Sequence, residues 1–435
     1  MGYRYNFKKN KFEKTGLLSI ETRQDDVHIY INDELYEHKV RRYSFIPKAI
    51  LSKIEYPTNV KISLLPDEYN IRLEKEGYWN WKNTISVYPN YTTFVTPIIL
   101  FKKSVPSNLK NGAMDNILSA NRDNIQVLKY EKASTTLLNL NLGNLNENKI
   151  YESSKRIKYF PSPNNQRILI SADNNYEIID PLSDKNIINL TAIIESKIEN
   201  VKWSEKNDYK LYAIETKSGL LYEIDLVSMS AKPLAIPSCQ DFIFFKEDIF
   251  ALKNDSLYKK TMLEKIKKGE EDTIEELPLS HSMSFIKNDL GYIFAKDNFN
   301  NILYIIDHSS GSVSKIKTSI HGITKFDANN SHDKILYAND YEIWIYDLTE
   351  DKKNLITRLS SPITNILWHN NEHYIIFSTE KNINIIKISP FGNNNYINMV
   401  SADSIGELLL DENGRKLYFT GRIDSQEGLF ELELY

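Results

Sequence analysis

The stretch "YEIWIYDLTEDKKNLI" (residues 341–356) alternates apolar and polar residues as far as Asp347, passes through polar turn residues and begins a second alternation. Such a pattern predicts a strand, a tight turn and another strand. The chain repeats it at "YEIIDPLSDKNII" (176–188), "LYEIDLVSMSAKPL" (221–234) and "LYIIDHSSGSVSKI" (303–316). This recurrence indicates a repeat architecture, and the repeat length decides which one.

The repeat length is about 40 to 43 residues when each unit is aligned by its first strand. Within a unit come a strand, a polar turn, a second strand such as "RILISA" or "KLYFTG", a third strand ending near Asp and a short fourth strand. Four strands per period of this length are typical of a β-propeller blade. A lone blade cannot bury both of its faces, so the blades must stack. The first strands begin near Met114, Arg156, Glu199, Gln240, Met283, Ile323, Thr364 and Ile405.

The sequence therefore predicts an all-β chain whose residues 113–435 form a propeller of eight four-stranded blades, with seven as the alternative count. The last unit ends in "GLFELELY" after its third strand, so the chain before Met114 is the candidate source of a fourth strand. The turns "FPSPNNQRILIS" and "LLDENGRKLYFTG" resemble those of WD-repeat-like and TolB-like propellers.

Residues 16–104 predict a small antiparallel β-sandwich, because short alternating strands are separated by turn residues. The clearest motif is "LLPDEYNIRLEKEGY", in which Tyr69, Ile71 and Leu73 alternate inward and Gly77 reverses the chain. Residues 1–15 form a basic and aromatic segment before this domain, and the polar residues 105–112 predict a linker after it.

The motifs "GLLSIET", "VHIYIND", "LPDEYNIRLEKEGYWNWKNTISV" and "IILF" make the first domain similar to the PEGA domain. Where that family has the Pro-Glu-Gly-Ala stretch, this chain has "QDDV" at residues 24–27. The resemblance implies an exported protein without catalytic residues in this domain. We therefore expect an extracytoplasmic location in the cell envelope, with membrane attachment only through a segment upstream of Met1.

Trp79 and Trp81 alternate on one predicted strand and are the candidate ligand-binding residues. Two aromatic rings on one face of a strand can stack on a sugar ring. The alternative, which we favour, is that they pack in the sandwich core or against the next domain.

Composition excludes several classes of function. Lys and Arg total 54 against 58 Asp and Glu, giving a net charge of −4 and no basic surplus for nucleic acid. The single cysteine, Cys239, cannot form an internal disulfide or a multi-thiolate zinc site. No stretch approaches the roughly 20 apolar residues of a membrane-spanning helix.

Metal and catalytic motifs are weak, and we expect no catalytic residue, no metal and no cofactor. His369 and His373 are four residues apart, but they flank a predicted hairpin turn and not a helix face. Asp297 and Asn301 have a calcium-loop-like spacing, but the central glycine and distal glutamate are missing. Turn capping explains them better, and it also explains the acids that recur at one position of the repeat, Asp180, Asp225, Asp307 and Asp347.

One unit is longer than the others, because residues 258–278 add a basic stretch followed by an acidic one. This stretch predicts a solvated loop, with a helical protrusion for a partner as the alternative.

These features predict a non-enzymatic envelope protein whose propeller binds a protein partner, as a scaffold or an adhesin, and whose PEGA-like domain is a stalk or anchor. The alternatives are a protein that binds cell-wall carbohydrate through Trp79 and Trp81, and a propeller hydrolase or lyase whose site is not visible in sequence.

Overall fold

The chain is almost entirely β-structure. A computed structural model of the protein describes residues 2–7, 10–36, 59–131, 133–180, 183–234, 238–246, 248–255, 257, 259–267, 270–308, 315–329, 331, 333–388 and 395–435. Among them the only helix is α2 (Thr191–Ile194), and none is long and apolar enough to cross a membrane. The predicted all-β class is confirmed. Two compact units are present, one of Met1–Gly112 with Thr364–Tyr435 and the other of Ala113–Ile363.

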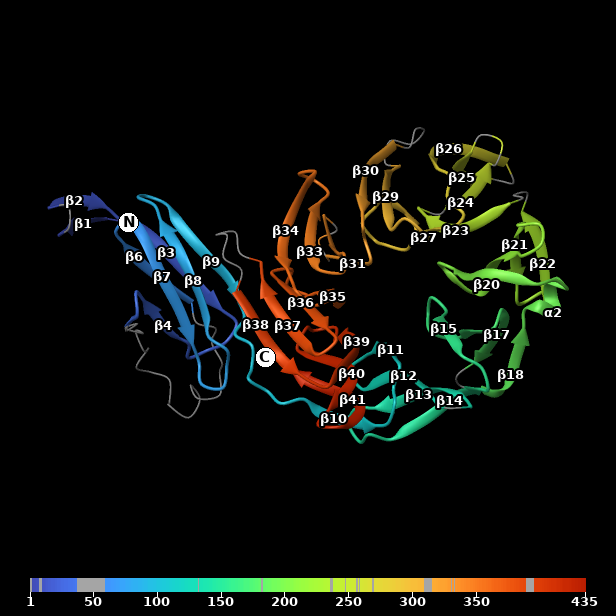
Figure 1. Cartoon of the computed structure of the whole chain (residues 1–435), viewed down its shortest axis with the longest axis horizontal. Helices are drawn as coiled ribbons and strands as arrows, with labels where there is room; N and C mark the ends of the chain where they lie inside the picture. Colours follow the sequence, from blue (N-terminus) through green and yellow to red (C-terminus); the bar gives the residue numbers. More distant parts are fainter. Residues whose placement is uncertain are drawn as a thin grey trace. The chain divides into compact units, whose positions relative to one another are not determined.

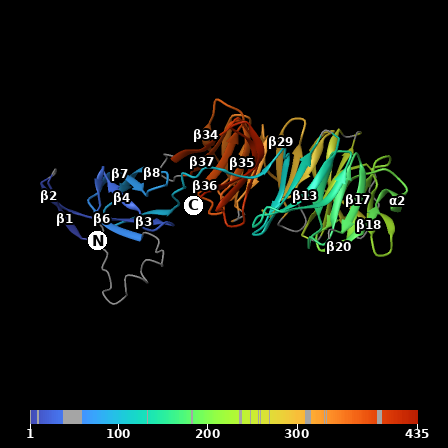
Figure 2. The same ribbon diagram turned by 90° about the horizontal axis from the view of Figure 1, so that it is seen from below.

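The first unit begins with a β-sandwich, in which β6-β3-β9 form one sheet and β5-β4-β7-β8 the other. Figure 2 shows the two layers, with β4, β7 and β8 above β3 and β6. The strands are β3 (Gly16–Thr22), β4 (His28–Ile31), β5 (Glu34–Leu35), β6 (Asn59–Leu64), β7 (Asp67–Glu74), β8 (Trp81–Val87) and β9 (Thr92–Ile98). The pairing of β3 with β9 is parallel and not antiparallel as expected, because the chain crosses from β8 back to the first sheet.

The buried residues of the sandwich alternate along β7 and β8, as the alternation of apolar and polar residues in the sequence predicts. Ile71 and Leu73 of β7 are buried, and Tyr69 packs against the same core from a half-buried position. In β8 the side chains of Trp81, Asn83, Ile85 and Val87 are buried, while those of Lys82, Thr84 and Ser86 between them are not. Alternating strands of this kind bury one face against the opposite layer. Ahead of the sandwich, β1 (Tyr3–Asn6) and β2 (Lys11–Lys14) pair as a separate two-stranded hairpin.

The described residues of the second unit form six four-stranded antiparallel sheets, each in the chain order of its strands. Figure 1 shows the sheets following one another, with first strands such as β23 and β27 innermost and fourth strands such as β26 and β30 outermost. They are β11 (Asn116–Ala120), β12 (Asn124–Tyr130), β13 (Thr135–Asn141), β14 (Glu147–Ser153); β15 (Ile157–Pro161), β16 (Ile168–Ala172), β17 (Asn175–Asp180), β18 (Ser183–Asn189); β19 (Ile198–Ser204), β20 (Asn207–Glu215), β21 (Leu221–Asp225), β22 (Ser230–Leu234); β23 (Cys239–Phe245), β24 (Asp248–Asp255), β25 (Lys260–Lys267), β26 (Glu270–Pro278); β27 (Met283–Ile286), β28 (Ile293–Asp297), β29 (Ile302–Asp307), β30 (Lys315–His321); and β31 (Lys325–Ala328), β32 (Lys334–Ala338), β33 (Glu342–Asp347), β34 (Lys352–Arg358).

Two further sheets of this kind belong to the first unit. One is β35 (Ile363–Trp368), β36 (Tyr374–Thr379), β37 (Asn382–Lys387) and β38 (Asn395–Ser401). The other is β39 (Ser404–Leu410), β40 (Lys416–Ile423) and β41 (Gln426–Glu433), completed by β10 (Ser107–Asn111) beside β41. The prediction that the chain before Met114 supplies the missing fourth strand is confirmed. Residues 105–112 thus contain a strand of the last sheet, where the sequence predicted a linker.

Each predicted first strand begins a sheet, so the described residues contain eight propeller-type sheets. Neighbouring sheets share their cores. Ile243 and Phe250 of the fourth sheet, for example, pack in one cluster with Phe285 and Ile293 of the fifth. The sequence period of about 40 residues therefore reflects sheets that bury their two faces only by stacking. Closure into an eight-bladed ring stays a prediction.

Residues 260–267 and 270–278 of the charged stretch 258–278 form strands, so both the loop and the helix interpretation are wrong for them. β25 and β26 pair along their whole length as the third and fourth strands of their sheet. Lys260 pairs with Glu276, and Lys265 pairs with Asp248 of β24, so neighbouring strands neutralise part of the charge run. Leu263, Ile266 and Leu277 are buried, although the many charged residues around them in the sequence do not indicate a buried face.

Candidate functional site

Three consecutive sheets each expose a large apolar side chain at the same structural position. The four strands of every propeller sheet are called A to D in chain order. In the B–C turns of the fourth, fifth and sixth sheets, Leu257 is 82% exposed, Phe299 84% and Tyr341 48%. These three residues, the B–C turn triad, are spaced 42 residues apart, which is one repeat.

One turn geometry presents all three side chains. The backbone N–H of Leu257 donates to Asp255 Oδ1 at 2.9 Å, that of Phe299 to Asp297 Oδ1 at 3.0 Å, and that of Tyr341 to Asn339 Oδ1 at 2.9 Å. An Asp or Asn that accepts the N–H two residues later makes an Asx turn and fixes the local backbone. The turns are therefore built by hydrogen bonds, and burial of the apolar side chains plays no part in them.

The B–C turns lie beside the D–A connections that lead from one sheet to the next. Asn298 N donates to Ser282 O at 2.9 Å, and Ile323 N donates to Asn301 O at 3.0 Å. In the sixth sheet the N–H of Leu359 donates to the carbonyl of Tyr341 at 2.8 Å. In antiparallel four-stranded meanders these two kinds of connection emerge at the same end, so the triad lies on one face of the second unit.

Hydrogen bonds between sheets hold this face in place. Buried Asp241, near the start of β23, accepts from Lys202 Nζ of the preceding sheet at 2.6 Å and from the Phe285 N–H of the following sheet at 2.7 Å. Asn200 Nδ2 donates to Gln240 O at 2.7 Å, one repeat further along. Three successive A strands are thereby connected near the ends from which the D–A connections emerge.

Sequence reasoning missed the triad, although a signal for it exists. The segments "NDSL", "KDNF" and "NDY" place an Asp or Asn two residues before an apolar residue at 42-residue intervals. For Asp297 the sequence favoured turn capping over a calcium site, and in the structure its carboxylate caps a turn. Burial acts to raise the pKa of Asp297, but hydrogen bonds from Asn300 outweigh this and hold the pKa below its usual value.

The recurring acids at the ends of C strands also cap turns. Asp225 Oδ1 accepts the N–H groups of Val227 and Ser228, and Asp347 Oδ1 accepts those of Thr349 and Glu350. The capping interpretation is confirmed for these two residues. The turns after Asp180 and Asp307 lie outside the described residues.

The structure separates Trp79 from Trp81. Trp81 is 2% exposed in the sandwich core, where it has no free face for a sugar, as the packing interpretation expects. Trp79 is half-buried against the core of the last two sheets, and Lys103 Nζ lies 5.4 Å from its ring centroid. The two rings therefore lie in different environments and form no shared platform.

His369 has a structural role. Its side chain is buried, and its ring nitrogens lie 3.0 Å from Asn371 Oδ1 and 2.9 Å from the Gly414 carbonyl oxygen. Burial lowers the pKa of His369 and also that of His373. Within the described part of the chain, no three His, Cys, Asp or Glu residues are grouped as metal ligands.

Cys239 is the chain's one thiol. Its side chain is buried, and burial raises the pKa of the thiol to about 12. A thiol of this kind stays protonated at neutral pH and is a poor nucleophile.

The sandwich carries a polar groove of about 390 Å³ beside β7 and β8. Arg72 lines it and is held in place, because its guanidinium lies 4.0 Å from the centroid of the Tyr30 ring and pairs with Glu74. Thr84 Oγ1 donates to Asn70 Oδ1 at 2.9 Å across the same groove. Arg72, Asn70 and Thr84 therefore already have polar partners.

Comparison with known proteins supports both parts of this architecture. Residues 57–98 match the PEGA domain, which confirms the resemblance predicted from the sequence. The matched segment spans the strands from β6 to β9. Comparison with curated proteins gives no match.

Among solved structures, a eukaryotic initiation factor superposes with a TM-score of 0.51 at 9% identity, covering 74% of this chain and 89% of that one. BamB from Moraxella catarrhalis gives a TM-score of 0.47 at 10% identity, covering 76% of this chain and all of that one. At such identities the likeness concerns the fold alone. The chain thus combines a PEGA domain with β-propeller architecture.

Proposed function

We propose that this protein is a non-enzymatic scaffold of the cell envelope whose propeller binds a protein partner through the face that carries the B–C turn triad. The observation that carries the proposal is the repetition of an exposed apolar side chain on an Asx turn in three consecutive sheets. Exposed apolar residues are common singly, but a row of them on one face is typical of an interaction site.

The contacts around the triad also suit protein binding. Asx turns and bonds between sheets hold the side chains in place before a partner arrives, so little conformational entropy is lost on association. Leu, Phe and Tyr offer apolar surface with one hydroxyl group, and aromatic anchors dominate the energetics of protein interfaces. PEGA domains occur in extracytoplasmic proteins, which supports an exported location.

The test compares two variants of the full chain. In L257S/F299S/Y341S the triad is lost but its Asx turns remain. The matched control, V227S/M229S, removes two exposed apolar residues from a C–D turn at the other end of a sheet. Val227 also follows an Asx turn, on Asp225, so the control differs mainly in the face that it alters.

Each protein is crosslinked in envelope fractions, and the captured partner is then purified for direct titration. We expect the dissociation constant to rise at least about 30-fold in the triad variant and to stay unchanged in the control, because the loss of one interface anchor alone costs about 2 kcal/mol. Equal binding by wild type and triad variant would refute the assignment of this face. Turnover of a captured glycan or peptide would refute the non-enzymatic part.

A further inference from the structure

The N-terminal hairpin has an aromatic face that remains exposed among the described residues of its unit. In β1 and β2, Tyr5 lies directly opposite Phe12 and Tyr3 opposite Lys14, so these side chains share one face of the ribbon. Phe7, in the turn, is 88% exposed and Phe12 is 70% exposed. The Tyr5 ring contacts Phe7 and Phe12 edge to face, with centroids 5.1 and 5.2 Å away.

This arrangement is unfavourable in water alone. A two-stranded hairpin with no further layer is marginally stable. Here the aromatic rings contact one another and remain exposed. More exposed aromatics adjoin the base of the hairpin, since Tyr91 O accepts from Leu17 N and Asn90 N donates to Thr15 O. Tyr88 and Tyr91 themselves are exposed.

Charge identifies the kind of partner. Residues 1–14 contain five basic residues against the single acid Glu13, in a chain whose net charge is −4. Lys14 Nζ lies 6.0 Å from the Tyr3 ring centroid, so a cation accompanies the aromatic face. The basic residues are Arg4, Lys8, Lys9, Lys11 and Lys14.

We propose that the hairpin formed by β1 and β2 docks on the surface of an anionic lipid bilayer. Tyr and Phe rings enter the headgroup region, where amphipathic aromatic side chains are favoured, and the basic residues pair with anionic headgroups. The hairpin lies on the membrane and does not cross it. This contact uses other residues than the proposed protein-binding face.

Flotation of the full chain with lipid vesicles tests the proposal. We expect binding to vesicles of phosphatidylglycerol with phosphatidylcholine and none to pure phosphatidylcholine. K11E/K14E removes two basic residues, each of which contributes about fivefold to binding, and introduces repulsion, so the affinity falls by more than about 25-fold. F7S/F12S abolishes flotation, because it removes the two most exposed rings of the hairpin.

Matched controls separate this contact from general stickiness. F299S/L257S removes two equally exposed apolar residues elsewhere, and K217E/K381E reverses two exposed lysines elsewhere. Both controls float like the wild type if the hairpin is the docking element. The proposal is overturned if the wild type ignores anionic vesicles, if the hairpin variants float as well as the controls, or if the wild type binds only anionic cell-wall polymer.

Discussion

Lys387 is an unusual residue at the end of β37, because its amine is buried and no acid among the described residues pairs with it. Its side chain is 6% exposed. Nζ lies 5.0 Å from the Trp81 ring centroid and 5.9 Å from that of Tyr374, so two aromatic rings take the place of a counter-ion. Cation–π contacts offset part of the cost of burying the charge. Burial lowers the pKa of the amine to about 8.

Replacing Lys387 by Met should stabilise the protein at neutral pH. The folded-state pKa of about 8 lies below the unfolded value of 10.5, so between these pH values the unfolded chain binds the proton more tightly. Wild-type stability from this group is therefore lowest below pH 8 and rises as the pH approaches 10.5. We expect Lys387→Met to be up to about 3 kcal/mol more stable below pH 8, because each pKa unit corresponds to about 1.4 kcal/mol.

Urea denaturation of wild type and variant across this pH range is the measurement. The difference between the two proteins should shrink as the pH rises, and a constant difference would contradict it. His373, whose pKa is lowered by burial and then by the charge of Lys387, is neutral throughout the range and adds no slope.

Sequence predicted residue roles where the chemistry is local. Asp297 and Asp347 were predicted to cap turns because an acid before a polar turn can reach the next N–H groups without any tertiary contact. The burial of Trp81 was only one of two alternatives, and it depends on the opposite layer. The exposure of Phe299 was not predicted, because a sequence does not show on which side of a turn an apolar residue lies.

At the scale of elements, the sequence predicted the position of β10 in the last sheet but assigned its residues to a linker. The incomplete last repeat required a fourth strand, and only the chain before Met114 could provide it. Its own residues, "SNLKN", are polar and half-exposed, so they read as a linker. Strand formation here is imposed by the open edge of β41, and local propensity contributes little.

Gly428 allows β10 to approach. A Cβ on this residue would overlap the carbonyl oxygen of Lys110 in β10. We expect Gly428→Val to displace β10 and to lower stability by about 1–3 kcal/mol, in the range of overpacking substitutions. Hydrogen exchange should show faster exchange at the amides of residues 107–111.

The exposed neighbour Glu427 provides the control, because Glu427→Val adds a β-branched side chain without meeting β10. Unchanged protection of residues 107–111 in Gly428→Val would show that β10 tolerates the change.

In the charged stretch 258–278 the sequence did not predict the strands that the structure contains. Lys260 and Lys265 pair with acids on adjacent strands, while Leu263 supplies the buried side of β25.

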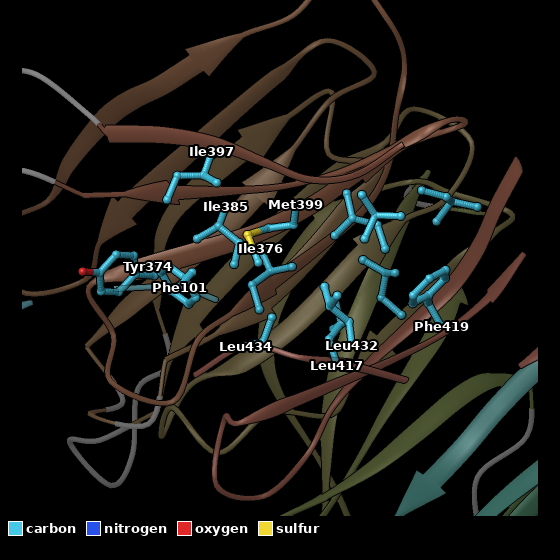
Figure 3. Packing of buried hydrophobic residues seen from close by; sticks show 14 of the residues in the cluster. Phe101, Tyr374, Ile376, Ile385, Ile397, Met399, Leu417, Phe419, Leu432 and Leu434 are labelled. Atoms are coloured by element: carbon cyan, nitrogen blue, oxygen red, sulfur yellow. The ribbon is translucent and has the colours of Figure 1, made fainter. Parts of the chain in front are cut away.

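At the scale of the first unit, one extended segment joins the core of the sandwich to the core of the last two sheets. The side chain of Leu100 packs in the sandwich, while those of Ile99 and Phe101 pack with Tyr374 and Leu434. Figure 3 shows Phe101 beside Tyr374, with Leu434 in the same cluster. Because successive side chains of an extended segment point to opposite sides, this segment places alternate side chains in two cores.

Backbone hydrogen bonds alternate in the same way. Leu100 exchanges two hydrogen bonds of 2.9 Å with the Gln24 side chain in the sandwich. On the other side, the Tyr374 hydroxyl accepts from Ile99 N at 2.9 Å, and Lys102 N donates to Leu434 O at 2.8 Å. The sequence placed a domain boundary at residue 104, since composition changes there. It did not show that "IILF" serves both cores, because the partner residues lie more than 270 positions later.

Phe101→Ala should therefore weaken the sandwich and the last two sheets together. The side chain is fully buried, so its truncation should cost about 3–5 kcal/mol of unfolding free energy. We expect hydrogen exchange to accelerate in β8 of the sandwich and in β36 and β37 of the adjoining sheet. The Phe101 ring packs on Tyr374 of β36, and Lys387 of β37 contacts both the Tyr374 ring and the Trp81 ring of β8. Phe94→Ala, seven residues earlier and exposed, should leave both regions unchanged. If β8 kept its wild-type protection while β36 and β37 lost theirs, the sandwich would be a separate domain on a tether, and its PEGA segment would act as a stalk.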